Sequence, residues 1–153
     1  MLIVLEGCDG SGKSTLAKDL SKIIGAEVIH CSSKTPNNKD FFEGIIESSR
    51  YRNIIADRFC YGQFVYQEEC DRPLGSLQDL HMLESKMLDA GAKVLFVIAP
   101  VEVIEKRLAS RNEVCINNLT VSDVQKRFEE LFENHSLLSE SVLYWDTCRG
   151  MIV

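Results

Sequence analysis

A glycine-rich motif placed directly after a short apolar segment constrains the fold of this chain more than any other feature. Residues 2–5 are an uninterrupted apolar run, which is typical of a strand buried on both faces of a sheet. The residues after it match the pattern G-x-x-x-x-G-K-[ST] without a gap, as Gly7-Cys8-Asp9-Gly10-Ser11-Gly12-Lys13-Ser14. Apolar residues with helical spacing then extend to Gly25. A strand, a glycine-rich loop and a helix in this order predict a loop that binds phosphate groups.

The residue types of this loop suit a polyanion. Glycines allow the backbone to curl until its N–H groups point inward, and the N-terminus of the following helix adds partial positive charge. We expect Lys13 to reach the β and γ phosphates and the Ser14 hydroxyl to bind Mg²⁺. The sequence therefore predicts ATP and Mg²⁺ as cofactors. The residues expected to bind the nucleotide are Gly7, Asp9, Gly10, Ser11, Gly12, Lys13, Ser14 and Thr15.

Strand-like and helix-like segments alternate along the rest of the chain. The expected strands are residues 2–5, 27–30, 53–56, 93–99 and 142–145. The expected helices lie around residues 16–24, 41–46, 61–70, 76–89, 100–111 and 120–132. Thr120 and Asp123 have the spacing of a capping box, which favours a helix start there. The alternation predicts one α/β domain over residues 1–153, in three layers, with a five-stranded parallel sheet flanked by helices.

Composition argues against several classes of partner. The 153 residues carry a net charge of −6, which opposes binding to nucleic acid or to an anionic membrane. The longest apolar run, residues 94–99, is far shorter than the roughly 20 residues that span a bilayer. The six cysteines are scattered without a Cys-x-x-Cys pair, which favours free thiols over disulfides. We therefore expect a cytoplasmic protein with a small-molecule partner, without nucleic acid and without a membrane.

The class of protein that carries the loop follows from the rest of the sequence. A GTPase needs an Asn-Lys-x-Asp guanine reader, and Asn38-Lys39-Asp40 has the wrong spacing. A GTPase also needs Asp-x-x-Gly after a strand, whereas Asp57 and Arg58 have no glycine at that offset. Motor and ATPase cores are usually longer than this chain. A small kinase fits best.

Two carboxylates and an arginine indicate where a second substrate binds. Asp57 and Arg58 follow the third predicted strand, and ligands gather at the carboxyl ends of strands in open α/β sheets. The planar fork of Arg58 suits an acceptor phosphate, while Asp57 can hold a metal-bound water or orient the attacking oxygen. Asp9 either faces a hydroxyl-bearing acceptor or caps the amides of its own loop. We predict catalytic roles for Lys13, Asp57 and Arg58, and metal-binding roles for Ser14 and Asp57.

The residues at these positions resemble two motifs of the thymidylate kinase family of nucleoside monophosphate kinases. Residues 6–15 resemble its Glu-Gly-x-Asp-Gly-x-Gly-Lys-[ST]-Thr signature. Residues 57–67 resemble its Asp-Arg-Tyr-x-x-Ser-x-x-Ala-Tyr-Gln signature, with Gly62 and Val65 as departures. Residues 100–111 are similar, more weakly, to the segment that leads into the family's lid. The resemblance spans most of the chain and implies the P-loop kinase fold.

The resemblance implies a role for each matching residue. It puts Asp9 on the 3′-hydroxyl of the acceptor and Arg58 on the acceptor phosphate. It puts Gln63 beside the acceptor base and Tyr66 under the deoxyribose, and Gln67 completes this substrate-binding motif. The family often dimerises through helices, so the resemblance is compatible with a homodimer.

Two arginines complete the expected site. Arg107 and Arg111 lie four residues apart on one face of a predicted helix, which is also the pattern of a solvated face. In the family, lid arginines carry positive charge towards the transferring phosphoryl group when a small residue follows the loop aspartate, as Gly10 does here. The resemblance thus implies catalytic roles for both arginines, a lid at about residues 107–120 and an acceptor region at about residues 31–70.

The resulting expectation is an ATP-dependent kinase of a deoxynucleoside monophosphate, with dTMP or a related pyrimidine as the implied acceptor. The chain is short between its second and third strands, where the family has a Thr-Arg-Glu-Pro-like stretch and a base-reading arginine. This chain has Ser32-Ser33-Lys34-Thr35-Pro36 there. The sequence therefore leaves the acceptor base open.

Two alternatives also stay open. The first is a kinase that acts on a 5′-hydroxyl, of a deoxynucleoside or of a polynucleotide end. Deoxynucleoside kinases resemble this chain in the phosphate loop and in an arginine after the third strand. They usually carry a glutamate just after the second strand as general base, and His30-Cys31-Ser32-Ser33 offers none. We expect a structural role for His30, which is isolated in the sequence. A nucleotide-binding regulator without catalysis is the second alternative.

Overall fold

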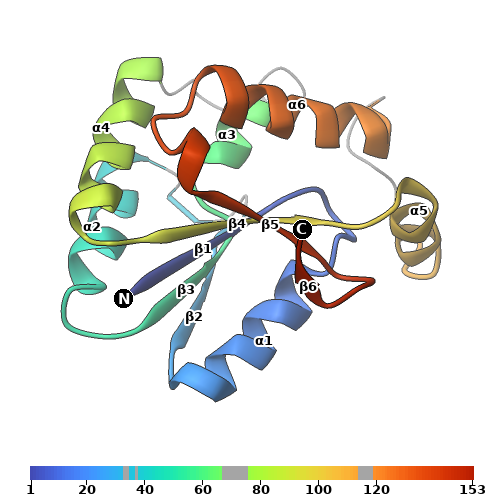
Figure 1. Cartoon of the computed structure of the whole chain (residues 1–153), viewed down its shortest axis with the longest axis horizontal. Helices are drawn as coiled ribbons and strands as arrows, with labels where there is room; N and C mark the ends of the chain where they lie inside the picture. Colours follow the sequence, from blue (N-terminus) through green and yellow to red (C-terminus); the bar gives the residue numbers. More distant parts are fainter. Residues whose placement is uncertain (33–34, 37, 67–75, 114–118) are drawn as a thin grey trace.

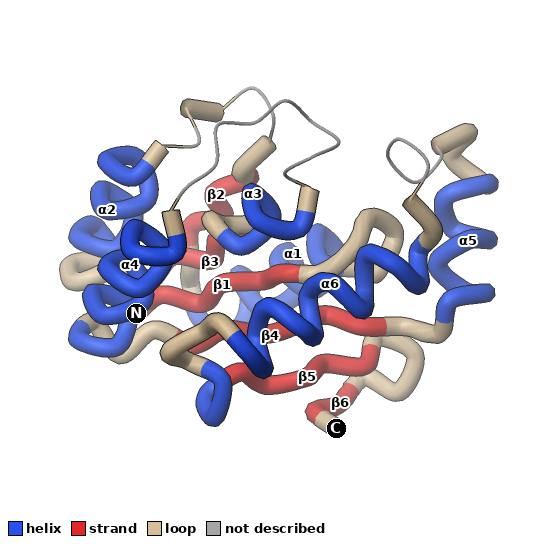
Figure 2. Tube along the Cα trace, turned by 90° about the horizontal axis from the view of Figure 1, so that it is seen from above, coloured by secondary structure: helices blue, strands red, loops and turns tan. Residues whose placement is uncertain are grey.

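Helices pack on both faces of a central sheet (Figure 1, Figure 2). The structure is a computed structural model, and it describes residues 1–32, 35–36, 38–66, 76–113 and 119–153. The strands are β1 (Leu2–Glu6), β2 (Glu27–His30), β3 (Ile54–Asp57), β4 (Lys93–Ile98), β5 (Val142–Asp146) and β6 (Met151–Ile152). The helices are α1 (Lys13–Ile24), α2 (Lys39–Ser48), α3 (Tyr61–Val65), α4 (Leu77–Asp89), α5 (Val101–Ala109) and α6 (Val121–Asn134), with a short 3-10 helix, η1 (Ser139–Ser141).

The strand order in the sheet is β2-β3-β1-β4-β5-β6. The first five strands pair in parallel, as predicted, because helical crossovers return the chain to the same end of the sheet. The prediction of five strands is wrong, since β6 adds a sixth strand antiparallel to β5. Asp146 stabilises the turn between them by accepting hydrogen bonds from the N–H groups of Cys148 and Arg149 at 2.8 and 3.2 Å. A strand of two residues leaves no periodic pattern in a sequence, so this one was not predicted.

The helices form the outer layers of a three-layer arrangement. Helix α1 packs on one face of the sheet, where its Leu16 and Ala17 meet Leu5, Ile55 and Val97. Helices α2, α3, α4 and α6 pack on the other face (Figure 1). Helix α5 lies beyond the carboxyl end of β4 (Figure 2). The predicted three-layer α/β architecture is confirmed.

The ends of the helices follow local capping rules. The predicted capping box at Thr120 and Asp123 is confirmed, because Thr120 Oγ1 accepts the Asp123 N–H at 3.1 Å and Asp123 Oδ2 accepts the Thr120 N–H at 2.9 Å. Helix α5 ends at Ala109, two residues before its predicted end. Helix α3 ends at Val65, and residues 67–75 lie outside the described residues.

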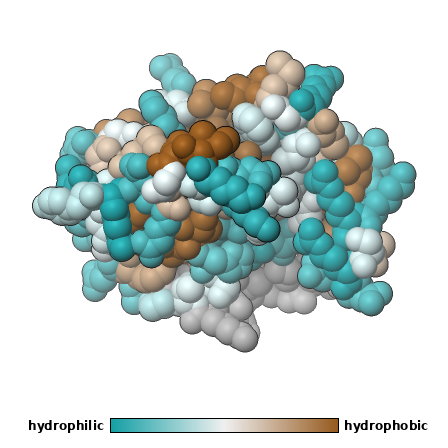
Figure 3. All heavy atoms as spheres, turned by 90° about the horizontal axis from the view of Figure 1, so that it is seen from below, coloured by the Kyte–Doolittle hydropathy of each residue, from teal (hydrophilic) through white to brown (hydrophobic). Residues whose placement is uncertain are grey.

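The surface carries apolar areas between its polar side chains (Figure 3). At the C-terminal edge of the sheet, Met151, Ile152 and Val153 are each about half exposed. Within the described ranges, no helix combines the length and the apolar character that a membrane span requires.

The core on the α6 side of the sheet is largely aromatic. Phe128 is fully buried on α6, and its ring centroid lies 5.5 Å from that of Phe96 on β4. The rings of Phe132 and Tyr66 each lie 6.2 Å from the ring of Phe128. Phe128 thus joins the sheet, α6 and the end of α3 in one packed cluster.

Truncation of this side chain should destabilise the fold. We expect Phe128→Ala to lower the free energy of unfolding by about 3–5 kcal/mol, because it removes a large buried ring and leaves a cavity. The measurement is urea denaturation. Lys126→Ala, on the exposed side of α6, is the matched control and should change the free energy by less than about 0.5 kcal/mol. Equal effects of the two substitutions would contradict the packing described above.

Candidate nucleotide site

The candidate site lies where β1, β2 and β3 end side by side. Parallel pairing sets Asp57 between Leu5 on one side and His30 on the other, so the carboxyl ends of the three strands meet at one edge. The glycine-rich loop leaves β1 at this same edge and leads into α1. The fold therefore brings the loop next to Asp57 and Arg58, although Asp9 and Arg58 are 49 residues apart in the sequence.

The curl of the loop depends on two glycines. Gly7 has a φ of +141°, and a Cβ atom on it would lie 2.4 Å from the carbonyl oxygen of Val97. Gly12, directly before α1, has a φ of +107°, and a Cβ atom on it would lie 3.0 Å from Cγ2 of Thr147. Residues with side chains rarely adopt either conformation. Gly7 has no room for a side chain, and at Gly12 the side chain of Thr147 would have to shift. The loop shape thus requires glycine at both positions.

Lys13 is buried at the centre of this loop. Its Nζ donates hydrogen bonds of 2.8 Å to the carbonyl oxygens of Gly7 and Cys8. Burial lowers the pKa of Lys13, and the charge of Arg58 lowers it further, while Asp9 opposes both effects. A buried ammonium group that meets mostly neutral carbonyls gains stability from an anionic ligand. The position of Lys13 therefore favours the binding of phosphate oxygens.

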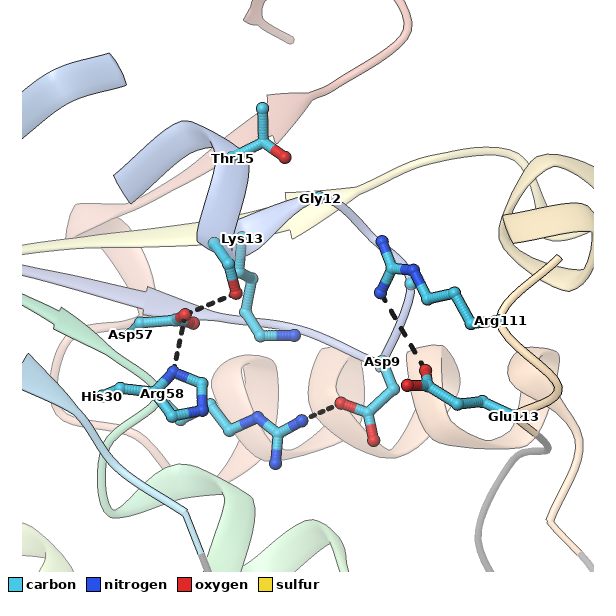
Figure 4. Close-up of a pocket in the computed structure, with 11 residues that line it drawn as sticks. Asp9, Gly12, Lys13, Thr15, His30, Asp57, Arg58, Arg111 and Glu113 are labelled. Atoms are coloured by element: carbon cyan, nitrogen blue, oxygen red, sulfur yellow. Dashed lines mark hydrogen bonds and ion pairs between the residues drawn. The ribbon is translucent and has the colours of Figure 1, made fainter. Parts of the chain in front are cut away.

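A cavity of about 280 Å³ opens beside the loop (Figure 4). Its cations are Lys13, Arg58 and Arg111, and its carboxylates include Asp9 and Asp57. The other lining residues are Gly10, Gly12, Ser14, Thr15, His30 and Glu113. The cavity thus combines three cations with glycine-loop backbone, a combination that suits an anionic ligand.

Arg58 is held in an unusual conformation at the wall of this cavity. Its φ of +72° is in the left-handed region, which a residue with a side chain adopts at an energetic cost. Its N–H donates to the carbonyl oxygen of Leu5 at 3.0 Å, and its guanidinium group forms an ion pair with the Asp9 carboxylate. In Figure 4 these two side chains point towards each other across the lower part of the cavity. The strained backbone thus holds a guanidinium group at the edge of the cavity that faces the loop.

Asp57 connects the loop to the end of β2. Its Oδ2 accepts hydrogen bonds from Ser14 Oγ at 2.6 Å and from His30 Nδ1 at 2.9 Å. Its Oδ1 is buried and has no hydrogen-bond partner among the described residues. A buried carboxylate oxygen without a partner is costly, and a hard cation or a water bound to it would satisfy that oxygen. Ser14 and Asp57 therefore fit a Mg²⁺ ion whose other ligands are waters and phosphate oxygens.

Glu6 anchors the turn that carries Arg58. It is 1% exposed, and its Oε1 accepts the N–H of Phe59 at 2.7 Å. Burial raises the pKa of Glu6 to about 7, although the Phe59 hydrogen bond and the charges of Lys13 and Arg58 act in the opposite direction. Because Phe59 follows Arg58 directly, this bond stabilises the strained turn.

A second cavity, of about 350 Å³, lies between α1 and the end of α5. Arg107 lines it, and its Nη1 donates to the carbonyl oxygens of Gly10 and Ser11 at 3.1 Å each and to Thr147 Oγ1 at 3.2 Å. Arg111 lines both cavities, and its Nη1 lies 3.9 Å from an oxygen of Glu113. The two arginines thus occupy the boundary between the loop and the second cavity.

The residues that the second motif implies as substrate contacts lie next to the site. Gln63 is buried within α3 and Tyr66 is buried at its end. Neither of them lines the cavity beside the loop as the described residues form it. Gln67 lies outside the described residues, as do residues 114–118 of the expected lid. The substrate contacts of these residues stay predictions.

Three residues of the site were not predicted from the sequence. His30 was expected to be structural, yet it lines the cavity; as the last residue of a predicted strand, it could have been found by the rule that identified Asp57. Glu6 is part of the first motif, but nothing in the sequence around it indicates that its side chain accepts a hydrogen bond from the N–H of Phe59. Thr147 follows the end of β5 and donates from Oγ1 to the carbonyl oxygen of Ser11 at 2.8 Å.

The sequence comparison identifies the family. The chain is 33% identical over 150 residues to the SPbeta prophage-derived uncharacterized protein YorR of Bacillus subtilis (strain 168), which covers 95% of this chain and 88% of YorR. The chain belongs to the YorR family. A crystal structure of YorR in complex with phosphorylated GDP matches it with a TM-score of 0.78 at 32% identity, over 97% of this chain and 87% of that one. No family model matches the sequence.

Other similarities show the wider fold. Deoxyadenosine kinase from M. mycoides with bound dATP has a TM-score of 0.60 at 16% identity, over 95% of this chain and 91% of that one. A thymidylate kinase of Neorickettsia sennetsu (strain ATCC VR-367 / Miyayama) is 28% identical over 130 residues, which is 63% of this chain and 65% of that one. The predicted P-loop kinase fold is confirmed, whereas thymidylate kinase itself stays a prediction.

The raised pKa of Glu6 predicts a pH-dependent stability. The group has an ordinary pKa of 4.5 when unfolded and about 7 when folded, so the folded state binds more protons between these values. Its contribution to stability is therefore lost as the pH rises through this window. Glu6→Gln has no proton to lose, so its free energy of unfolding, relative to that of the unmodified protein, should rise from pH 5 to pH 8.

Urea denaturation at several pH values measures this difference. The exposed Glu130→Gln on α6 is the control, and its difference from the unmodified protein should be nearly independent of pH. A pH-independent difference for Glu6→Gln would contradict the raised pKa.

Proposed function

We propose that this protein is a nucleotide kinase that transfers the γ-phosphoryl group of ATP, or of another purine nucleoside triphosphate, to a deoxynucleoside monophosphate. The observation that carries the proposal is the ion pair of Arg58 and Asp9 on the cavity that Lys13 also lines. A site that bound only the donor phosphates would need only the cation of the phosphate loop, Lys13. A second cationic group at the end of β3 gives the cavity a place for a second anion.

The arrangement suits a transfer in line between two phosphates. The bond from the γ-phosphorus to the bridging oxygen breaks, a bond to an oxygen of the acceptor phosphate forms, and the nucleoside diphosphate leaves. Such a reaction needs positioning and neutralisation of charge more than covalent chemistry. In the proposal, Lys13 neutralises the donor phosphates and Arg58 neutralises the acceptor phosphate, while Asp9 moves from Arg58 to a hydroxyl group of the acceptor sugar.

Ser14 and Asp57 would hold Mg²⁺ in the proposed enzyme. The bound ion neutralises charge on the donor phosphates. The loop backbone and the start of α1 supply further N–H groups to those phosphates. Arg107 and Arg111, at the start of the proposed lid over residues 107–120, add positive charge on the far side of the loop.

The acceptor is proposed to lie against residues of about 31–70, with a pyrimidine such as dTMP as the first candidate. Gln63 lies within α3 and Tyr66 at its C-terminal end, and neither of them is among the described residues that line the second cavity. The thymidylate kinase similarity, over 65% of that protein's length, supports this choice. The phosphorylated GDP bound by YorR supports nucleotide binding in the family, without naming the acceptor.

A second function is favoured by one observation. His30 ends β2, lines the cavity and donates to Asp57, so the strand end that lacks the usual glutamate carries an imidazole. Deoxynucleoside kinases usually have their general base just after this strand. A deoxynucleoside or a polynucleotide 5′-hydroxyl is therefore the alternative acceptor, and the net charge of −6 favours the free deoxynucleoside.

An acceptor screen tests the proposal. The assay measures release of nucleoside diphosphate from ATP or GTP with Mg²⁺, in the presence of each deoxynucleoside and each deoxynucleoside monophosphate. We expect release that depends on a monophosphate. Release with deoxynucleosides alone would support the alternative. No release with any acceptor, despite nucleotide binding, would contradict both functions and indicate a regulator.

Removal of the loop lysine should abolish most of this activity. We expect Lys13→Ala to lower turnover by at least about 100-fold, because its buried ammonium group contacts the phosphates in the transition state. Lys18→Ala, on the exposed side of the same helix, should keep normal turnover. Near-normal turnover of Lys13→Ala would show that the loop is not the donor site.

Substitution of Arg58 should affect the acceptor rather than the donor. Arg58→Lys keeps the charge but loses the planar fork, so we expect the KM for the monophosphate to rise by about 10- to 100-fold. The KM for the donor should stay within about twofold in the same assay. An unchanged KM for the monophosphate would show that Arg58 does not bind the acceptor phosphate.

A further inference from the structure

The second cavity carries a carboxylate to which the transfer reaction gives no role. Asp19 lines one wall of it, on the stripe of α1 that also includes Thr15 and Leu16. Arg107, on α5, also lines this cavity. A carboxylate and a guanidinium group thus face the same space of about 350 Å³, which is large enough for a purine base.

The cavity lies where the base of a loop-bound nucleotide would lie. Asp19 is about 9 Å further along the axis of α1 than Lys13, at 1.5 Å for each residue. Gly12 and Thr15 line both cavities, so the space is continuous with the phosphate loop. Trp145, half-buried at the end of β5, gives the second cavity an apolar wall. A base that extends from the loop would therefore enter the cavity that both Asp19 and Arg107 line.

The guanidinium group is held in place before any ligand binds. Arg107 donates only from Nη1, to the carbonyl oxygens of Gly10 and Ser11 and to the Thr147 hydroxyl. Its Nε and Nη2 have no hydrogen-bond partner in the part of the chain that the structure describes. Asp19 has a loose ion pair with Lys22, at 3.8 Å between exposed groups, which is a weak interaction. Both residues thus keep hydrogen-bonding groups for a ligand.

The two purine bases differ in how they fit these groups. Guanine presents the acceptors O6 and N7, which a guanidinium group binds as a pair, and the donors N1–H and N2–H, which a carboxylate binds as a pair. Adenine presents an amino donor at position 6 and an acceptor at N1. The acceptor would face the carboxylate of Asp19, and the amino group would face the cation.

We infer that the second cavity is a base site that selects guanine over adenine, with Asp19 as the residue that recognises the base. This inference rests on the proposed function, because it takes the loop as the site of the donor phosphates. It makes GTP the preferred donor.

Equilibrium binding of GDP and ADP with Mg²⁺, measured by isothermal titration calorimetry, tests the inference without turnover. The unmodified protein should bind GDP at least about 10-fold more tightly than ADP, the range expected for one good paired contact to a base. In Asp19→Asn this ratio should fall by at least about 10-fold, because an amide has one acceptor oxygen where the carboxylate has two, and its NH₂ group can donate to adenine N1. Lys22→Ala removes the partner of Asp19 outside the cavity and should keep the ratio of the unmodified protein.

The outcomes separate this inference from the proposed function. Equal affinity for GDP and ADP in the unmodified protein would overturn the inference while leaving the kinase intact. A ratio that Asp19→Asn does not change would overturn the role of Asp19. If neither nucleotide bound, the proposed function itself would fail, and the inference with it.

Discussion

The parallel pairing of β1 with β3 is the interaction on which the site depends. It aligns Leu5 with Asp57, so that the glycine-rich loop and the Arg58 turn leave the sheet at the same edge. Two further contacts stabilise this alignment: the Arg58 N–H donates to Leu5, and the Glu6 carboxylate accepts the Phe59 N–H. If β3 shifted by one residue relative to β1, its side chains would exchange the two faces of the sheet. Asp57 and Arg58 would then no longer be aligned with the glycine-rich loop.

The ionised groups of the site have hydrogen-bond or ion-pair partners within the protein before a ligand arrives. Arg58 pairs with Asp9, Lys13 donates to loop carbonyls, and Asp57 accepts from Ser14 and His30. These contacts lower the cost of burying ionised groups at one edge of the sheet. An anionic ligand can give the Lys13 ammonium group charged acceptors in place of neutral carbonyls, since phosphate oxygens form charge-assisted hydrogen bonds with it.

Local patterns predicted most of the secondary structure because each pattern lies within one short segment. The run at residues 2–5, the loop at residues 7–14 and the capping box at Thr120 all have their expected structures. The sixth strand was not predicted, because two residues are too few for periodicity and its turn depends on Asp146. The position of His30 in the site was not predicted, because the strand-end rule that identified Asp57 was not applied to the end of β2, which lies beside β3.

The sequence by itself determined the α/β class, and it predicted the phosphate-binding character of the loop and the candidate role of the residues that follow the third strand. Each of these follows from short contiguous segments, because the spacing of apolar residues and the conformations of glycine act within a segment. Only the tertiary structure decided that Arg58 meets Asp9, that His30 meets Asp57 and that Arg107 meets Thr147. These pairs are separated by 49, 27 and 40 residues, so their contacts depend on strand order and register rather than on any local pattern.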